Sequence, residues 1–240
     1  EFAPERHIQS AKYYPDPANG KVTVTGLVQG QGTLQLTALW EDKPVGEAAL
    51  SVEDGFFTAQ LDLSETHLWE PGKGGLYTLL LSFGEDRVKS YFGLRTAKFQ
   101  GRKFLLNGKS LFQRFVLDQG FYPEGIYTAP TEEDLVKDIQ LSFAAGFNGA
   151  RLHEKVFEAR FLYHCDRLGY LVWGEYPNWG LDHAHPLSTE TYLNQWSEAV
   201  ERDFNHPAII GWCPFNETWG YREEREKNAL LTSLYKLTKR

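Results

Sequence analysis

Methionine is absent from this 240-residue sequence, and cysteine occurs only twice. Cys165 lies on an expected helical face and Cys213 beside an expected strand, which favours buried free thiols over a disulfide. No apolar run approaches the roughly 20 residues that a membrane-spanning helix needs. The first residues, Glu1-Phe2-Ala3-Pro4, show no signal-peptide pattern. The lack of methionine favours a processed product or an excised piece, and the location stays open, with the cytoplasm slightly favoured.

Positive charge is also in short supply, because 25 Lys and Arg face 32 Asp and Glu, for a net charge of -7. Nucleic acid and anionic membranes attract basic surfaces, so we expect neither as a partner. Apolar residues make up 42% and aromatic residues 15% of the chain, which indicates a globular protein with a substantial core. The length allows one large domain or two ordinary ones.

Short β-type runs separated by turn signals fill the first 97 residues. The runs lie at 21–27, 33–40, 56–61, 77–83 and 88–94, with turns such as Asn19-Gly20 between them. This spacing predicts an antiparallel sandwich of about seven strands. No titratable groups gather in it, so we expect residues 1–97 to be a scaffold domain.

The pattern changes over residues 98–240, which we predict to be a second domain. Asn107-Gly108 between two apolar runs indicates a tight hairpin. Strands then alternate with helices, which predicts a parallel sheet. The expected strands are 113–118, 147–152, 170–175 and 208–213, and the expected helices begin at Thr131 with a capping box, near 155, near 189 and near 222.

Asn216 and Glu217 lie just beyond the carboxyl end of the fourth expected strand. Parallel α/β barrels keep their catalytic groups at the carboxyl ends of the strands. A carboxylic acid held there between Trp212 and Trp219 would be partly desolvated, which suits it to donate a proton near neutral pH. Glu217 is therefore the first catalytic candidate, and the alternative is a surface glutamate after a loop.

Several motifs resemble glycoside hydrolase family 2, which contains β-galactosidases and β-glucuronidases. They are N-H-P-A-I-I-G-W at 205–212 followed by N-E, F-L-L-N-G-K at 104–109, T-E-E-D-L-V-K-D-I at 131–139, G-F-N-G-A-R at 146–151 and L-G-Y-L-V-W-G-E at 168–175. The run L-W-E-P-G-K-G-G-L-Y-T-L at 68–79 resembles the immunoglobulin-like domain that precedes the barrel in this family. The resemblance implies an immunoglobulin-like β-sandwich followed by the first four βα units of a (β/α)8 TIM barrel, truncated within the catalytic domain.

The same resemblance implies a retaining glycoside hydrolase that cleaves O-glycosidic bonds of the β-galactoside or β-glucuronide type. Glu217 would be the general acid/base, and Asn216 would bond the 2-hydroxyl of the sugar. Retention requires a second, attacking carboxyl, which the family carries on the seventh strand and which has no counterpart here. We therefore expect a carbohydrate substrate, no cofactor and no metal, and no activity from this chain alone.

Charged side chains also end the second and third expected strands. The resemblance implies that Arg151 orients the attacking glutamate, but without that partner it can pair with Glu175 or Glu217. Glu175 then lines or supports the pocket, or is simply an ion-pair partner. His153 is either a substrate contact or a satisfied histidine at the rim.

Polar and aromatic residues near the same rim are further candidates for sugar binding. Asp118 and Gln119 end the first expected strand and can bond sugar hydroxyls. Tyr176, Trp179 and Trp219 can stack on a sugar face, and the alternative for each is packing.

Two other functions compete with hydrolysis. The chain can be a non-catalytic carbohydrate-binding or scaffold piece. It can also be a metal-dependent hydrolase, because Asp182-His183-Ala184-His185 contains an H-x-H pair. An open half-barrel would in addition expose strand edges and apolar faces, so we expect self-association.

Overall fold

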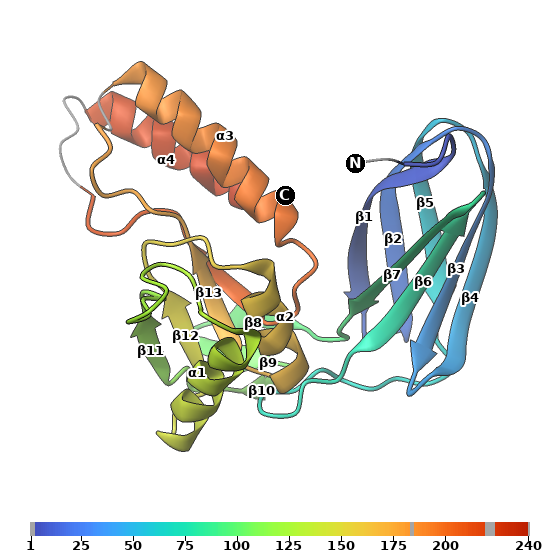
Figure 1. Cartoon of the computed structure of the whole chain (residues 1–240), viewed down its shortest axis with the longest axis horizontal. Helices are drawn as coiled ribbons and strands as arrows, with labels where there is room; N and C mark the ends of the chain where they lie inside the picture. The colour runs from blue at the N-terminus through green and yellow to red at the C-terminus, as the bar shows by residue number, and fades with distance from the viewer. Residues whose placement is uncertain (1–2, 183–184, 219–223, 240) are drawn as a thin grey trace. The chain divides into compact units, whose positions relative to one another are not determined.

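The computed structural model describes residues 3–182, 185–218 and 224–239, and its chain divides into two compact units (Figure 1). The first unit comprises Glu1–Phe112, Asp166–Gly169 and Asn205–Pro207, and the second comprises Gln113–Cys165, Tyr170–Phe204 and Ala208–Arg240. The main boundary between the two compact units falls after Phe112. The domain boundary that the sequence suggests between residues 97 and 98 stays a prediction.

Two antiparallel sheets form most of the first unit, with strand orders β1-β2-β5 and β4-β3-β6-β7. Within the described residues these sheets contain the seven strands that the turn spacing predicted, although the sequence had not located β1 or β4 individually. Their bounds are β1 His7–Asp16, β2 Lys21–Gln29, β3 Gly32–Trp40, β4 Lys43–Val52, β5 Gly55–Asp62, β6 Tyr77–Phe83 and β7 Asp86–Phe92.

A single hydrophobic core joins the two sheets. Successive side chains of a strand point to opposite faces, so alternate residues are buried. Val22 and Val24 of β2 and Leu34 and Leu36 of β3 are all at most 1% exposed and belong to one cluster. The first unit is therefore a two-layer β structure with its core between the layers.

A small third sheet, β10-β9-β8, completes the first unit. It consists of β8 Ala97–Gln100, β9 Lys103–Leu106 and β10 Lys109–Ser110. The turn between β9 and β10 has φ of 50° at Asn107 and 76° at Gly108. Both angles are positive, as a two-residue hairpin of the primed type requires, so the predicted hairpin is confirmed.

The second unit is built on a parallel sheet of order β11-β12-β13-β14, and a helix connects each strand to the next along the chain (Figure 1). The predicted alternation of strand and helix is confirmed in the described residues. None of the described helices has the length and apolar character to cross a membrane. The elements are β11 Phe115–Asp118, α1 Glu132–Ala144, β12 Gly149–Leu152, α2 Ala159–Leu168, β13 Leu171–Glu175, α3 Pro186–Arg202, β14 Ile209–Cys213 and α4 Glu224–Thr238.

Register decides which side chains share a face of this sheet. Leu117 of β11 lies opposite Arg151 of β12, and Arg151 lies opposite Trp173 of β13. Partners in parallel strands point to the same side, and residues two apart on a strand do so too. Arg151 and Glu175 are therefore on one face, whereas Asp118 is on the other.

Helices α3 and α4 lie side by side and pack through large side chains (Figure 1). Tyr192 and Trp196 of α3 form one cluster with Leu230 and Leu234 of α4. Helix α3 begins three residues before the predicted start, because Pro186 occupies its first turn and His185 its N-cap. Proline suits that position, since its missing N–H would have no helical partner there.

The capping box at α1 gives a first test. The Oγ1 of Thr131 accepts a hydrogen bond from the N–H of Asp134, whose side chain accepts one from the N–H of Thr131. Thr131→Ala removes the cap, and we expect the free energy of unfolding to fall by about 1 kcal/mol. Urea denaturation followed by circular dichroism measures the change. Thr232→Ala, at an exposed position within α4, is the control, and an equal loss in both variants would contradict the assignment.

Candidate active site

An ion pair between Arg151 and Glu175 lies at the carboxyl ends of β12 and β13. The Nε of Arg151 is 2.6 Å from Oε2 of Glu175, and Nη2 is 3.2 Å from Oε1. The Glu175 side chain is fully buried, and the main-chain N–H of Glu154 also donates to it. Hydrogen bonding to Glu175 raises the pKa of Arg151. Of the two partners considered for Arg151, the structure shows Glu175.

Asn216 is hydrogen-bonded to the same arginine. The Nη2 of Arg151 donates to the Oδ1 of Asn216 over 2.7 Å. Because a guanidinium group can only donate, this bond fixes which end of the amide is oxygen. The Nδ2 of Asn216 is then buried and has no hydrogen-bond partner within the described residues. Buried donors are seldom left unpaired, so this Nδ2 marks a position where a hydrogen-bond acceptor is expected.

Asn178 holds the main chain of Asn216, a contact that the sequence analysis missed. Its Oδ1 accepts from the N–H of Asn216 at 2.7 Å, and its Nδ2 donates to the carbonyl of Asn216 at 3.1 Å. Asn178 lies three residues beyond the end of β13. A search of all polar residues just past the predicted strand ends would have included it.

Glu154 is the second residue that the sequence analysis missed. Its Oε2 accepts hydrogen bonds from the main-chain N–H groups of Asn178 and Trp179, at 3.0 and 3.1 Å. Its own backbone is left-handed, with φ of 52°. Glu154 lies two residues beyond β12, where the same search would have found it.

Glu217 directly follows Asn216 and is exposed. We expected it to be partly buried between Trp212 and Trp219, and the structure differs: Trp212 packs edge-on against Trp196 of α3, and Trp219 lies outside the described residues. The backbone of Glu217 has φ of 42°. Such a conformation costs about 1–3 kcal/mol in a residue other than glycine and is concentrated at functional sites.

Gln119, His153 and Trp179 extend this cluster. The Nε2 of Gln119 lies 3.0 Å from the Nδ1 of His153, and the His153 ring meets Trp179 edge-on with centroids 6.2 Å apart. The indole N–H of Trp179 donates to the carbonyl of Asn216 over 3.3 Å. Trp179 is nevertheless 61% exposed, so much of its aromatic surface is accessible to a ligand.

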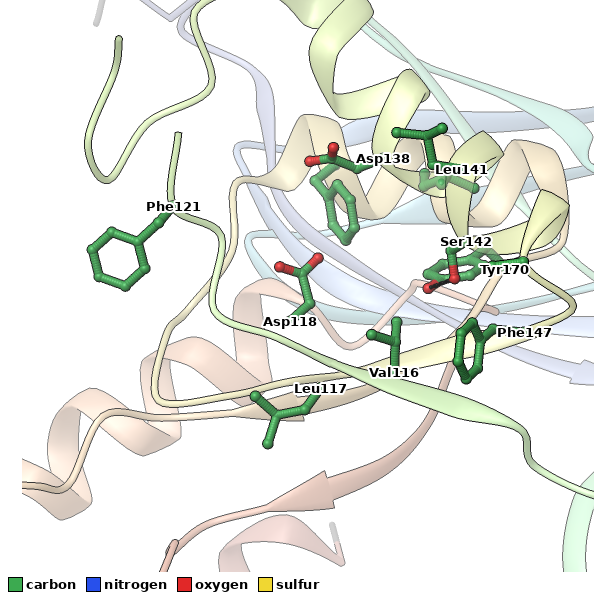
Figure 2. A pocket seen from close by; sticks show the side chains of 12 residues that line it. Val116, Leu117, Asp118, Phe121, Asp138, Leu141, Ser142, Phe147 and Tyr170 are labelled. Atoms are coloured by element: carbon green, nitrogen blue, oxygen red, sulfur yellow. Dashed lines mark hydrogen bonds between the residues drawn. The ribbon is translucent and has the colours of Figure 1, made fainter. Parts of the chain in front are cut away.

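The structure separates Asp118 from these residues. Its side chain points toward Asp138 of α1, on the opposite side of the strand from Leu117 (Figure 2). It lines a cavity of about 360 Å³ together with Ser142 and Tyr170. Burial raises the pKa of Asp118. The hydrogen bond from the N–H of Gly120 lowers this pKa, and the nearby charge of Asp138 raises it further. Asp118 therefore does not share a face with Arg151.

Tyr176 also faces away from the cluster. Its ring packs edge-on against Tyr192 and Trp196 of α3, with centroids 5.0 and 6.5 Å away, and its hydroxyl donates to Gln195. The packing alternative for Tyr176 is therefore the one that the structure shows.

Both cysteines are free, as predicted, with Cys165 buried and Cys213 half-buried. Cys213 ends β14 and lies opposite Glu175 in the register. Burial, with the Glu175 carboxylate as the next cause, raises the pKa of the Cys213 thiol to about 11. The thiol is therefore protonated near neutral pH and does not act as a thiolate nucleophile.

The H-x-H pair is only partly described. His183 lies outside the described residues. His185 caps α3, where its side chain accepts from the N–H of Leu187. The metal-dependent alternative stays a prediction.

A parallel sheet with its polar cluster at the carboxyl ends of the strands is the arrangement of an α/β-barrel enzyme. The family model described as Glycosyl hydrolases family 2, TIM barrel domain, matches residues 98–240. The chain therefore belongs to glycosyl hydrolase family 2, a family of glycosidases.

Individual relatives agree with this assignment. A β-glucuronidase of Paenibacillus borealis is 28% identical over 233 residues, which cover 85% of this chain and 38% of that protein. A β-galactosidase of Lactococcus lactis subsp. lactis is 34% identical over 179 residues, which cover 69% of this chain and 18% of that protein. The chain thus spans well under half the length of these two relatives.

Solved structures share the fold. A Faecalibacterium prausnitzii β-glucuronidase superposes with a TM-score of 0.82 at 29% identity, over 98% of this chain and 40% of that one. A Ruminococcus gnavus β-glucuronidase in complex with an N1-substituted uronic isofagomine superposes with a TM-score of 0.86 at 18% identity, over 98% of this chain and 41% of that one.

The raised pKa of Asp118 gives a test by pH. A carboxyl whose folded-state pKa lies above the ordinary 3.8 favours the folded state below that value, and this contribution is lost as the pH rises through the folded-state pKa. Asp118→Asn keeps an acceptor for Gly120 and cannot ionise. We expect the stability of the variant relative to wild type to increase from about pH 4 to about pH 8, measured by urea denaturation.

Asp54→Asn is the matched control for that test. Asp54 is exposed and also accepts a glycine N–H, that of Gly30, over 2.8 Å. The same pH dependence in both variants would contradict a specific effect of burial at Asp118.

Proposed function

We propose that this chain supplies the acid/base part of the active site of a retaining glycoside hydrolase that acts on β-galactosides or β-glucuronides. The observation that carries the proposal is the side chain of Asn216, which Arg151 holds through Oδ1 and whose buried Nδ2 has no partner among the described residues, one residue before the exposed Glu217. An oriented amide donor next to an accessible carboxyl suits a sugar hydroxyl beside a departing glycosidic oxygen. Family membership supports the same chemistry.

The proposed reaction has two steps. Glu217 protonates the departing oxygen while a second carboxylate attacks the anomeric carbon, which forms a covalent glycosyl intermediate and releases the alcohol. Glu217 then takes a proton from water, which attacks the same carbon and frees the second carboxylate. The Nδ2 of Asn216 bonds the 2-hydroxyl, and Arg151 keeps that amide in orientation through Oδ1.

Glu175 does not suit the attacking role. Its carboxylate is fully buried and already accepts from Arg151 and from the N–H of Glu154. The family resemblance assigns the attacking glutamate to a seventh barrel strand, and the described parallel sheet has four strands. We therefore propose that the 240-residue chain does not hydrolyse glycosides by itself.

Substrate contacts are proposed for Trp179, Gln119 and His153. Trp179 presents an exposed aromatic surface for stacking on a pyranose. Gln119 and His153 lie beside it and carry polar groups. Asp118 and Tyr176 are not included, because their side chains face the helices.

The first unit is proposed to be the immunoglobulin-like domain of the family. Two antiparallel sheets of three and four strands packed around one core are consistent with that fold. Its role is then scaffolding. The proposed barrel begins after it, at the boundary that we place between residues 97 and 98.

A non-catalytic carbohydrate-binding function is the alternative for the chain alone. The exposed Trp179, and the Nδ2 of Asn216 that lacks a partner in the part of the chain that is described, favour sugar binding without a second catalytic carboxyl. Isothermal titration of the chain with galactose and glucuronate, beside nitrophenyl glycoside assays, separates the two functions.

Glu217→Gln tests the acid/base role in the complete natural polypeptide that carries this sequence. We expect kcat/KM to fall about 10²–10⁴-fold on glycosides with poorly leaving alcohols. The kcat/KM for dinitrophenyl glycosides should be nearly unchanged, because dinitrophenolate leaves without a proton. Glu85→Gln changes an exposed turn of the first unit and should leave both values unchanged. Equal losses on the two substrates would refute an acid/base role for Glu217.

Self-association of the 240-residue chain is also proposed. Strand β11 lies at one end of the described sheet, and Leu117, Leu141 and Phe147 near it are 53%, 58% and 37% exposed. Edge strands beside apolar surface favour pairing with a second copy.

Light scattering at micromolar concentration tests this association. We expect a dimer or larger species, and Leu141→Lys should shift it toward monomer. Leu187→Lys, at a 66% exposed position of α3, should not. A monomeric wild type that unfolds cooperatively would overturn the proposal.

A further inference from the structure

We propose that Asn178 is a positioning residue for the general acid/base. Its side-chain amide fixes the main chain of Asn216, and this holds Glu217 in the conformation from which it can protonate the departing oxygen. The inference rests on the role proposed for Glu217.

Asn178 pairs with both main-chain groups of Asn216. One planar amide satisfies both the N–H and the carbonyl of Asn216, at 2.7 and 3.1 Å. A side chain that bonds both main-chain groups of one residue fixes the position and the orientation of that peptide segment. Asn178 is 1% exposed, so water does not compete for these bonds.

Asn178 also contacts Thr218, the residue on the far side of Glu217. The Nδ2 of Asn178 also donates to the Oγ1 of Thr218 over 2.9 Å, and this hydroxyl donates back to the carbonyl of Asn216 over 3.1 Å. Asn178 therefore contacts the residues before and after Glu217. The carboxyl between them stays exposed.

The backbone of Glu217, between these two residues, is strained. A left-handed backbone at a residue other than glycine persists only where the surrounding structure imposes it. The bonds from Asn178 are constraints of that kind, because they fix the peptide before the strained residue and the side chain of the residue after it. Without them, the φ of 42° at Glu217 relaxes toward ordinary values and the carboxyl moves with it.

Asn178 is itself held in position by neighbouring residues. The Oε2 of Glu154 accepts from its main-chain N–H, and Pro177 before it has a restricted φ. Glu154 itself bonds Glu175 through its main chain. The turn that carries Glu217, residues 216–218, is thus connected to the buried ion pair of Arg151 and Glu175 through Asn178 and Glu154.

Asn178→Asp is the test, made in the complete natural polypeptide that carries this sequence. The variant keeps an acceptor for the N–H of Asn216 but replaces the Nδ2 donor by an oxygen that faces the Asn216 carbonyl. We expect kcat/KM to fall about 10–100-fold on glycosides with poorly leaving alcohols. Dinitrophenyl glycosides should lose much less, because their cleavage needs no proton from Glu217.

Asn205→Asp is a matched control. In the first unit, the Asn205 side chain also bonds one main-chain N–H and one main-chain carbonyl, those of Tyr13 and Ala11, both at 2.9 Å. Both variants should lower the thermal unfolding temperature, but only Asn178→Asp should change the ratio of kcat/KM between the two substrates. Stability alone cannot produce that difference.

The outcomes separate this inference from the proposed function. If Glu217→Gln shows the dependence on leaving group and Asn178→Asp does not, Asn178 is not a positioning residue for the acid. If neither variant shows the dependence on leaving group, the acid/base role of Glu217 is refuted, and the inference about Asn178 is refuted with it. An equal loss on both substrates in Asn178→Asp also overturns the proposal.

Discussion

The ion pair between Arg151 and Glu175 is the interaction on which the rest of the site depends. A carboxylate that is fully buried is stable only when its oxygens are paired, and Glu175 obtains its partners from Arg151 and the N–H of Glu154. Removal of one partner from such a pair costs about 3–5 kcal/mol. The parallel register of β12 and β13 makes the pair possible, because it brings both side chains to one face of the sheet.

Buried and exposed groups of the site have different tasks. Arg151 and Asn178 use buried or half-buried hydrogen bonds to fix Asn216, one through its side chain and the other through its main chain. Glu217 and Trp179 are exposed and can reach a ligand. This division keeps the geometry rigid where water is excluded, and it leaves accessible the carboxyl that transfers the proton in the proposed reaction.

Local signals predicted many elements correctly. The hairpin at Asn107-Gly108 and the capping box at Thr131 depend on residues within a few positions of each other, so sequence alone was sufficient. The start of α3 was misplaced because Pro186 was not taken as a helix start. Among the site residues, Arg151, Glu175 and Asn216 were named from their positions at strand ends, and the structure brings these three together.

The sequence by itself determined the order of strands and helices, the family resemblance and the strand ends at which polar residues gather. Only the tertiary structure decided which way those residues face and what they bond. Asp118 and Arg151 both end parallel strands, yet the two-residue period places them on opposite sides of the sheet. Asn178 acts through main-chain groups of Asn216, 38 residues away. Main-chain groups are identical in every residue except proline, so no residue pattern reveals which of them a distant side chain will bond.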